Sequence, residues 1–253
     1  MKTKIITVAN QKGGVGKTTT ALAVSSFLNN LGKNVLLIDL DPQGNATLAS
    51  GIVVGEEQGT YEILSEDFNI YDAIVKKSGY DIMPASNELV SIDQLLSQRT
   101  GREYKLKKAL QSIDGEYDFV IIDTPPQLST LTVNALTACH NVIIPVQADI
   151  FSMQGSSQLV ETIQGVREYT NPNIEISGIL LTRYSARAIL SQNVREMLDE
   201  FASAIGSKLF ETTIRETVVV KESQIEQKML SEYKATASVD YKNFVGELLE
   251  VLA

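Results

Sequence analysis

Short runs of apolar residues recur along the chain, and stretches with helical spacing separate them. The clearest runs are residues 5–9, 35–38 and 119–122. A short continuous apolar run is typical of a strand that is buried on both faces in a parallel sheet. Later runs that predict further strands are Val142–Val146, Ile176–Leu181 and Leu209–Ile214. The pattern therefore predicts a mostly parallel sheet of seven or eight strands.

A helix is expected between the first two strands, beginning near Thr18. Gly32 supplies the residue that commonly ends a helix. The apolar positions at helical spacing are Leu22, Val24, Phe27, Leu28 and Leu31. Strand, helix and strand form a βαβ unit, and its right-handed crossover brings the ends of both strands to one edge of the sheet.

The rest of the chain continues this alternation, less regularly between Gly51 and Gly115. In that region we expect helices at Tyr61–Leu64, Tyr71–Lys76, Leu89–Leu96 and Tyr104–Ile113, and a strand at Tyr80–Met83. Later helices are expected at Gln154–Tyr169, Gln192–Ile205 and Val239–Leu252. Alternating strands and helices predict an α/β fold with helices on both faces of the sheet. No repeat or linker divides the chain, so we expect one domain over residues 1–253.

A glycine-rich segment, Lys12-Gly13-Gly14-Val15-Gly16-Lys17-Thr18-Thr19, lies between the first strand and the first helix. Its glycines permit backbone angles closed to other residues and let main-chain N–H groups wrap a polyphosphate. Lys17 adds a cation at the β- and γ-phosphates, and Thr18 offers a hydroxyl to a phosphate-bound Mg²⁺. A strict P-loop also needs glycine at position 11, but this chain has Gln11 there and a second lysine, Lys12, inside the loop. The segment predicts a nucleotide site; the alternative is a surface turn that binds nothing.

Three aspartates follow two of the predicted strands. Asp39 and Asp41 come directly after the run 35–38, and Asp123 follows the run 119–122. Because ligands of such folds bind beyond the carboxyl ends of the strands, these carboxylates should lie beside the glycine-rich loop. Phosphoryl transfer needs neutralised phosphates, a metal and a positioned water, so we expect an ATPase. Thr18 would ligate Mg²⁺ directly, Asp39 and Asp123 would hold its water shell, and Asp41 would orient the attacking water. The alternative for Asp39 and Asp41 is a turn-capping role.

The composition limits the classes of protein to which this chain can belong. The formal net charge of -9 argues against a generally basic nucleic-acid binder, so any DNA contact must come from a local cluster. The single cysteine, Cys139, excludes an intramolecular disulfide and is expected to be packed rather than reactive. The sole histidine, His140, is expected at the surface. No signal-like segment or membrane-spanning run is present, so we predict a cytoplasmic protein without membrane contact.

The glycine-rich loop with its extra lysine resembles the deviant Walker A loop of ParA/MinD-type ATPases. Nearly the whole chain is similar to small ParA-type partitioning ATPases, without the N-terminal helix-turn-helix extension of larger relatives. The further motifs that carry this resemblance are Asp39-x-Asp41-Pro42-Gln43-Gly44-Asn45, Ile122-Asp123-Thr124-Pro125-Pro126 and Ile144-Pro145-Val146-Gln147.

The resemblance implies an ATP-dependent cycle. In that family ATP closes a sandwich homodimer, in which the lysine that matches Lys12 reaches the phosphates of the partner subunit. The dimer binds DNA non-specifically, and a ParB-type or analogous centromere-binding protein stimulates hydrolysis and releases it. The cycle moves plasmid or chromosome cargo, so the resemblance implies a nucleoid-associated protein.

One region departs from the family pattern. Many relatives show Ile-Pro-Arg-Asn-x-Arg where this chain has residues 214–219, so Glu216 and Val219 replace two expected basic positions. The candidates for DNA contact are Arg187, Arg215 and Lys221. The alternative for each is an ordinary solvated cation on an acidic protein.

Two other function classes share this fold. A MinD-type membrane-positioning ATPase needs a basic amphipathic C-terminal helix, whereas residues 241–250 carry two acids and one base. An ATP-dependent metabolic enzyme is the second alternative, and its iron–sulfur version needs cysteine ligands that one Cys139 cannot supply. ATP-dependent retention on DNA, compared with liposomes or small carboxylic substrates, separates the three.

Overall fold

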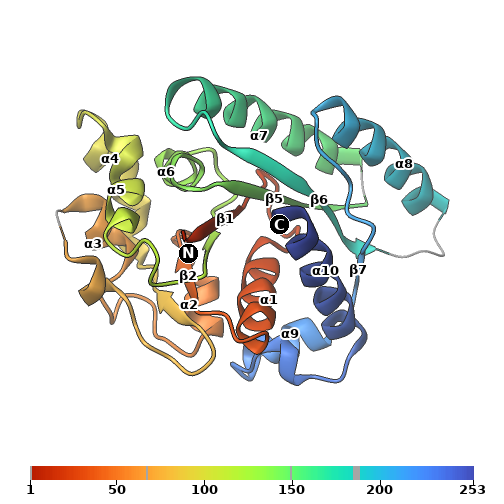
Figure 1. Cartoon of the computed structure of the whole chain (residues 1–253), viewed down its shortest axis with the longest axis horizontal. Helices are drawn as coiled ribbons and strands as arrows, with labels where there is room; N and C mark the ends of the chain where they lie inside the picture. The colour runs from red at the N-terminus through yellow and green to blue at the C-terminus, as the bar shows by residue number, and fades with distance from the viewer. Residues whose placement is uncertain (1, 67, 149, 185–188) are drawn as a thin grey trace.

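The computed structural model describes residues 2–66, 68–148, 150–184 and 189–253. Within these residues it forms a seven-stranded sheet in the order β3-β2-β4-β1-β5-β6-β7, with every neighbouring pair of strands parallel (Figure 1). The strands are β1 Lys4–Val8, β2 Val35–Asp39, β3 Asp81–Met83, β4 Phe119–Asp123, β5 Asn141–Gln147, β6 Glu175–Tyr184 and β7 Ile214–Arg215. The α/β fold predicted from the sequence is confirmed.

Ten α-helices lie in the described part of the chain. They are α1 Lys17–Asn30, α2 Asn45–Ala49, α3 Thr60–Ser65, α4 Ile92–Leu96, α5 Lys105–Gln111, α6 Thr130–Ala138, α7 Ile150–Tyr169, α8 Ile189–Ala204, α9 Val219–Ile225 and α10 Thr236–Leu252. Short 3₁₀ turns are η1 Ile70–Ala73, η2 Asn87–Ser91, η3 Arg102–Tyr104 and η4 Leu230–Glu232.

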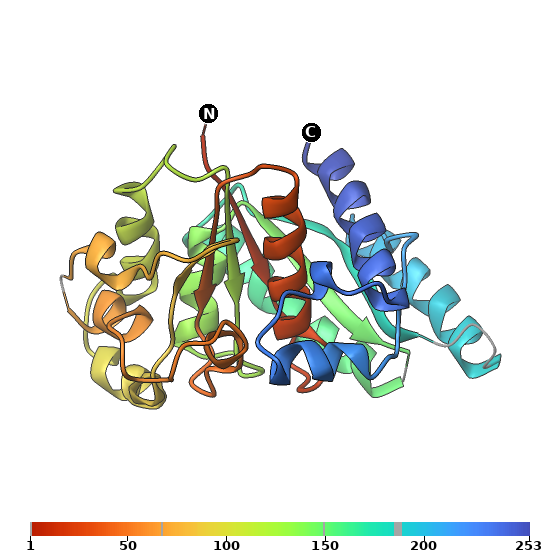
Figure 2. The ribbon, with the colours of Figure 1, turned by 90° about the horizontal axis from the view of Figure 1, so that it is seen from below.

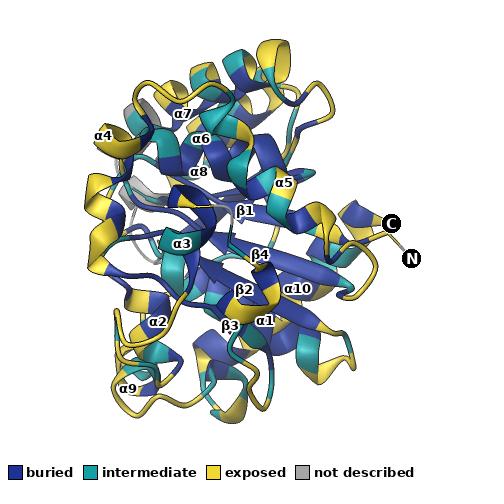
Figure 3. Ribbon diagram, turned by 90° about the vertical axis from the view of Figure 1, so that its left-hand side faces the viewer, coloured by how far each residue is buried: buried dark blue, intermediate teal, exposed yellow. Residues whose placement is uncertain are grey.

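Alternate residues of the central strands pack on opposite faces of the sheet. Val35 and Leu37 of β2 join a core with α1 and α10, whereas Leu36 and Ile38 join one with α3 to α6. Beyond β1 the second face is covered by α7 and α8. Figure 1 shows α1 and α10 on one side of the sheet and α6, α7 and α8 on the other, and Figure 3 shows the strands buried between these layers. Burial on both faces explains why the strands are continuous apolar runs rather than alternating ones.

Helix α1 begins directly after the glycine-rich loop. Gly16 precedes it with φ of 90°, and no side chain caps its first turn. The helix ends at Asn30, and Gly32 lies two residues later with φ of 76°, as expected for a glycine at a helix end. Leu31 differs from the predicted apolar stripe because it follows the last helical residue and is 57% exposed. The uncapped N-terminus leaves backbone N–H groups directed at the carboxyl edge of the sheet.

Two predicted elements are corrected by local hydrogen bonding. The helix expected at Tyr71–Lys76 is only the 3₁₀ turn η1, because Val75 forms an antiparallel bridge with Ile82. The strand expected at Leu209–Ile214 is interrupted: Leu209 forms an isolated parallel bridge with Ile179 of β6, and the regular strand is only Ile214–Arg215. The Glu247 carboxylate accepts hydrogen bonds from the backbone N–H groups of residues 211 and 212, at 2.8 and 3.0 Å. A side chain therefore takes the donors that would extend this edge strand.

His140 is a structural residue rather than the surface residue that we expected. It is half-buried, and its Nδ1 accepts a hydrogen bond of 3.0 Å from the backbone N–H of Ile5. Burial and the nearby Lys2 and Lys4 lower the pKa of its imidazole, which keeps Nδ1 available as an acceptor. Cys139 is buried as predicted, and burial raises its thiol pKa to about 12.

Both ends of the described chain lie on the side of the sheet away from the start of α1, as Figure 2 shows. The Lys4 ammonium donates a hydrogen bond of 2.6 Å to the carbonyl of Leu252, which ties the last helix to the first strand. None of the helices in the described ranges is long and apolar enough to cross a bilayer. The opposite, carboxyl edge of the sheet carries the candidate site.

Candidate active site

A cavity of about 700 Å³ opens at the carboxyl edge of the sheet. The glycine-rich loop, the start of α1, the loop between β2 and α2, and α9 form its walls. Its lining residues are Gly13, Gly14, Gly16, Lys17, Thr18, Thr19, Asp41, Gln43, Asn45, Leu48, Ala49, Pro126, Lys221, Gln224 and Ile225. Most of the predicted nucleotide-binding residues therefore meet in one cavity of the size that ligand sites have.

The glycine-rich loop adopts a conformation that its glycines permit. Gly14 and Gly16 have φ of 76° and 90°, a region that other residues rarely adopt. A side chain at Gly13 or Gly14 would meet nothing within 4 Å, so these glycines border open space. Backbone N–H groups can therefore approach a phosphate without Cβ atoms in the way.

Two side chains whose roles sequence reasoning missed, Asn10 and Gln147, hold this loop. The Asn10 Nδ2 donates to the carbonyl of Pro145 at 2.7 Å, and its Oδ1 accepts from the Lys12 N–H at 3.0 Å. Gln147 Nε2 donates to the carbonyl of Gly14 at 2.6 Å. Only Gln147 carried a signal, as part of a motif without an assigned role.

Thr182, at the end of β6, supports the same loop from the other side. Its hydroxyl donates to the carbonyl of Val15 at 2.8 Å, and Val15 itself is fully buried. Val15 therefore anchors the loop in the core rather than contacting a ligand through its side chain. The loop is fixed by strands β5 and β6, which come late in the sequence.

Lys17 is buried at the base of the cavity, with 6% of its surface exposed. Its ammonium donates to the carbonyl of Lys12 at 3.0 Å. Burial lowers its pKa, and the negative charges of Asp123 and Asp41 oppose that shift. A desolvated cation at the cavity is suited to bind phosphate oxygens.

Lys12 lies apart from Lys17. It lines an adjoining hollow with Gln11, Gln127 and Gln158, on the side of the loop that faces α7. The two lysines of the loop therefore border different spaces.

Asp39 and Asp41 are separated by one residue but have different surroundings. Asp39 is fully buried, and its oxygens accept hydrogen bonds from the Asp41 N–H (3.1 Å), the Thr47 N–H (2.8 Å) and the Thr47 hydroxyl (2.7 Å). Burial raises its pKa to about 6, against the effect of these donors. Asp41 lines the cavity, and its Oδ1 accepts from the Gln43 N–H at 3.0 Å. Asp41 is thus the carboxylate placed toward a ligand.

Asp123 ends β4, and among the described residues its side chain has no hydrogen-bonding partner. Both of its carboxylate oxygens are buried, and neither accepts a hydrogen bond from any described residue. Burial raises its pKa well above the usual range, and the charge of Asp39 adds to the shift. The Thr18 hydroxyl is close enough to lower the pKa somewhat, although its geometry does not make a regular hydrogen bond.

An unsatisfied buried carboxylate beside a threonine hydroxyl fits hydrated Mg²⁺, which prefers oxygen ligands and keeps several waters. Among the described residues, no group of three or more acidic, histidine or cysteine side chains could hold a metal alone. The side-chain oxygens of Thr18, Asp39 and Asp123 therefore suit a cation that enters the site together with the phosphates.

The candidates for DNA contact have three different surroundings. Arg187 lies outside the described residues. Arg215 is exposed but is bound by the Asp240 carboxylate, with Nε–Oδ2 and Nη2–Oδ1 distances of 2.9 and 2.6 Å. Lys221 lines the nucleotide cavity, and with Arg215 it also borders a smaller cavity of about 180 Å³. Arg215 and Lys221 are thus neighbours, at the rim of the site.

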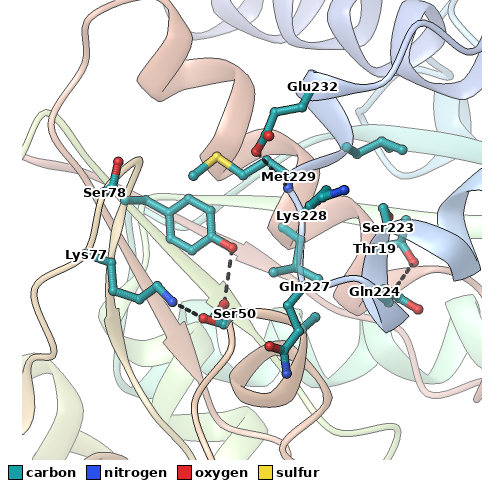
Figure 4. A pocket seen from close by; sticks show the side chains of 14 residues that line it. Thr19, Ser50, Lys77, Ser78, Ser223, Gln224, Gln227, Lys228, Met229 and Glu232 are labelled. Atoms are coloured by element: carbon teal, nitrogen blue, oxygen red, sulfur yellow. Dashed lines mark hydrogen bonds between the residues drawn. The ribbon is translucent and has the colours of Figure 1, made fainter.

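A further cavity of about 340 Å³ adjoins the nucleotide site (Figure 4). Gln224 of α9 borders both cavities, and its Nε2 donates to the Thr19 hydroxyl at 3.3 Å. On the opposite wall, Figure 4 shows Lys77 directed at the backbone of Ser50. Gln224, Thr19 and Ala49 therefore form the boundary between the two cavities.

Comparison with known proteins decides the family. The AAA domain family profile matches residues 3–176. The chain is 41% identical over 223 residues to the sporulation initiation inhibitor protein Soj of Bacillus subtilis, covering 87% of each chain. It is 38% identical to the chromosome partitioning protein ParA of Caulobacter vibrioides, covering 97% of this chain and 94% of that one. The chain belongs to the ParA/Soj family of partitioning ATPases.

The site agrees with this ParA/Soj assignment, and the prediction of an ATPase is confirmed. A solved structure of cobyrinic acid a,c-diamide synthase from Mycobacterium smegmatis, with a bound ATP analog and magnesium, has the same fold. Its TM-score is 0.82 at 35% identity, with 98% of this chain and 95% of that one covered. The ParA/Soj fold thus accepts a magnesium-bound nucleotide in a protein with this degree of likeness.

Proposed function

We propose that this ATPase segregates plasmid or chromosomal DNA through an ATP-dependent dimer. The observation that carries the proposal is the separation of the two loop lysines: Lys17 is buried in the nucleotide cavity, while Lys12 borders the adjoining hollow. A second lysine outside its own cavity is what a site shared between two subunits needs. The partition roles named for relatives at about 40% identity support the same conclusion.

The loop N–H groups and Lys17 bind the phosphates of ATP. Thr18 would ligate Mg²⁺, and Asp123 with Asp39 would hold its water shell; the ion supplies charge neutralisation at the phosphates. The orphaned Asp123 carboxylate fits this role because its oxygens have no donor among the described residues.

Asp41 orients the attacking water. The Gln43 N–H holds one of its oxygens, so the carboxylate has a fixed direction at the cavity wall. Water attacks the γ-phosphorus while the bond to the β–γ bridging oxygen breaks, giving ADP and phosphate. The rate acceleration comes from positioning the water and the phosphates rather than from covalent chemistry with the protein.

The dimer, and not the monomer, binds DNA. A chain with net charge -9 has little attraction for DNA, whereas joining two copies doubles any basic patch formed by Arg187, Arg215 and Lys221. Binding is independent of sequence, and a ParB-type or other centromere-binding protein stimulates hydrolysis and so releases the dimer. The protein acts in the cytoplasm, on the nucleoid, without contacting a membrane.

Gel shifts with ATP, ADP and no nucleotide, beside sedimentation of the same samples, test this proposal. ATP alone should give both a dimer and DNA retention, and retention should weaken steeply as salt rises. Lys12→Ala should lose dimer and DNA binding together, whereas Asp41→Ala should hydrolyse slowly and accumulate the DNA-bound dimer. A wild-type dimer that shows no DNA retention at low salt would overturn the proposal.

A second candidate is an ATP-dependent amide-forming enzyme, favoured by the likeness to cobyrinic acid a,c-diamide synthase. Such an enzyme would couple ATP hydrolysis to a carboxylic substrate and a nitrogen donor. ATP turnover that rises with such substrates, and stays constant with DNA and a centromere-binding protein, would favour this candidate. Pelleting with anionic liposomes tests the membrane-positioning class in the same assay series.

A further inference from the structure

Thr47 forms a buried hydrogen-bond junction beneath the nucleotide site. It lies in α2 and is fully buried. Its hydroxyl donates to Asp39 Oδ2 at 2.7 Å and accepts from the backbone N–H of Ala85 at 2.9 Å. Its own backbone N–H donates to the same Asp39 oxygen at 2.8 Å. One side chain thus links α2, the end of β2 and the segment after β3.

The junction continues to Asp41. The other oxygen of Asp39, Oδ1, accepts the backbone N–H of Asp41 at 3.1 Å. The neighbouring Leu40 N–H is bonded to the carbonyl of Asp123 at 3.0 Å. The backbone that carries Asp41 is therefore fixed at two successive N–H groups, one of which depends on the orientation of Asp39.

We propose that Thr47 is a positioning residue for ATP hydrolysis: its hydroxyl fixes the Asp39 carboxylate, and Asp39 in turn fixes Asp41. The inference rests on the role proposed above for Asp41. Thr47 does not line the nucleotide cavity, although Asn45, Leu48 and Ala49 around it do. It therefore acts through Asp39 and not through contact with ATP.

The hydroxyl matters because it is donor and acceptor at once. Without it, Asp39 Oδ2 keeps only the Thr47 N–H, and the Ala85 N–H loses its acceptor. A carboxylate held by one donor fewer can turn about its Cβ–Cγ bond, and the Asp41 N–H then loses its fixed partner. A displacement of about 1 Å in a reacting group can cost about 100-fold in rate.

Thr47→Val keeps the shape of the side chain and removes the hydroxyl. We expect single-turnover hydrolysis to slow by about tenfold while the dissociation constant of a fluorescent ATP analogue stays within about twofold. Thr47→Ser restores the hydroxyl and should restore the rate. Equal losses in the Val and Ser variants would overturn the proposal.

Thr137→Val is the matched control for lost stability. Thr137 is also fully buried in a helix, and its hydroxyl bonds to that of Thr170 at 2.9 Å, outside the nucleotide cavity. Thr137→Val and Thr47→Val should both lower the denaturation midpoint, but Thr137→Val should leave the hydrolysis rate unchanged. If Thr137→Val slows hydrolysis as much as Thr47→Val, the effect is one of stability and the proposal fails.

A double-variant cycle with Asp41→Ala separates the role proposed for Thr47 from the role proposed for Asp41. If Thr47 acts through Asp41, Thr47→Val should have no further effect on the rate in the Asp41→Ala background. A full tenfold loss in that background would refute the positioning role. Normal hydrolysis by Asp41→Ala alone would instead refute the role proposed for Asp41.

Discussion

Asp39 and Asp123 lie opposite each other in the register of neighbouring parallel strands, but only one is satisfied by hydrogen bonds. Asp39 accepts from three donors, whereas Asp123 accepts from no described residue. Both are buried, and burial raises both pKa values. The pair is thus one fixed and one open carboxylate, which suits the Mg²⁺ that we propose for this site.

The stability of the nucleotide-free protein should fall as pH rises above about 4. The folded-state pKa of Asp39 is about 6, above its usual value of 3.8, and that of Asp123 is also raised. The unfolded chain therefore ionises first, so stability is present below about pH 4 and is lost as pH rises through these folded pKa values. Denaturant titrations should show a loss on the order of 1–3 kcal/mol. Asp123→Asn should flatten the plot of unfolding free energy against pH. An unchanged slope in that variant would contradict the raised pKa of Asp123.

Lys17→Ala should abolish nucleotide binding, because the phosphates lose the buried cation of the cavity. Lys12→Ala should retain ATP affinity within a few-fold, since Lys12 lines a different hollow. Fluorescence titration with a labelled ATP analogue measures both. Equal losses of affinity in the two variants would show that both lysines serve the same bound nucleotide.

Asp240 should limit DNA binding by Arg215. Its carboxylate holds the guanidinium in two hydrogen bonds, so a DNA phosphate must compete with it. Asp240→Asn should strengthen ATP-dependent DNA retention, and Arg215→Ala should weaken it while the dimer remains. Gel shifts at several salt concentrations, beside sedimentation, measure these effects. Weaker DNA retention by Asp240→Asn would mean that the Arg215–Asp240 ion pair supports the fold and that Arg215 does not contact DNA.

His140 should make the protein less stable in mild acid. Its folded-state pKa is lowered from 6.5, so the unfolded chain takes up the proton first. The contribution is present above about pH 6.5 and is lost as pH falls through the lower folded value. His140→Asn keeps an acceptor near the Ile5 N–H but does not titrate. The difference in unfolding free energy between the wild type and His140→Asn, measured across pH, gives the contribution of His140. This difference separates it from the opposite trend of Asp39 and Asp123.

Gln227→Gly should stabilise the protein by about 0.5–1 kcal/mol. Gln227 follows α9 with φ of 52°, a left-handed conformation that glycine adopts without cost. The turn is closed by the Lys228 N–H, which donates to the carbonyl of Ser223 at 3.0 Å. Gln227→Ala, which keeps the strained backbone, should give no gain in a chemical denaturation experiment. A similar gain from alanine would trace the effect to the side chain instead.

The sequence was sufficient for the parts of the site that one segment encodes. The loop 12–19 and the carboxylates after β2 and β4 were predicted because each motif contains its own chemistry and strand ends share one edge. Asn10, Thr182 and Thr47 were missed because single polar residues have no periodic signature. Their roles depend on partners up to 167 residues away, such as the carbonyl of Val15 for Thr182.

The same reasoning explains the errors in the fold. Leu209–Ile214 has the composition of a strand, but the competing acceptor belongs to Glu247 of α10, which no local pattern reveals. Tyr71–Lys76 failed because the Val75–Ile82 bridge overrides the helical spacing. Edge elements have one neighbour instead of two, so a single side chain can redirect them.

The strand order places the acidic residues of the site and the side chains that hold its loop on different sides of β1. Strand β1 is central, with β4, β2 and β3 on one side and β5, β6 and β7 on the other. Asp39 and Asp123 end β2 and β4, and Asp41 follows β2, whereas Gln147, Thr182 and Arg215 lie at or near the ends of strands on the opposite side. The departure from the family pattern, at Glu216 and Val219, lies only beyond β7. Because the edge strand β7 pairs with β6, substitutions beyond it leave β2 and β4, which hold the carboxylates, unchanged.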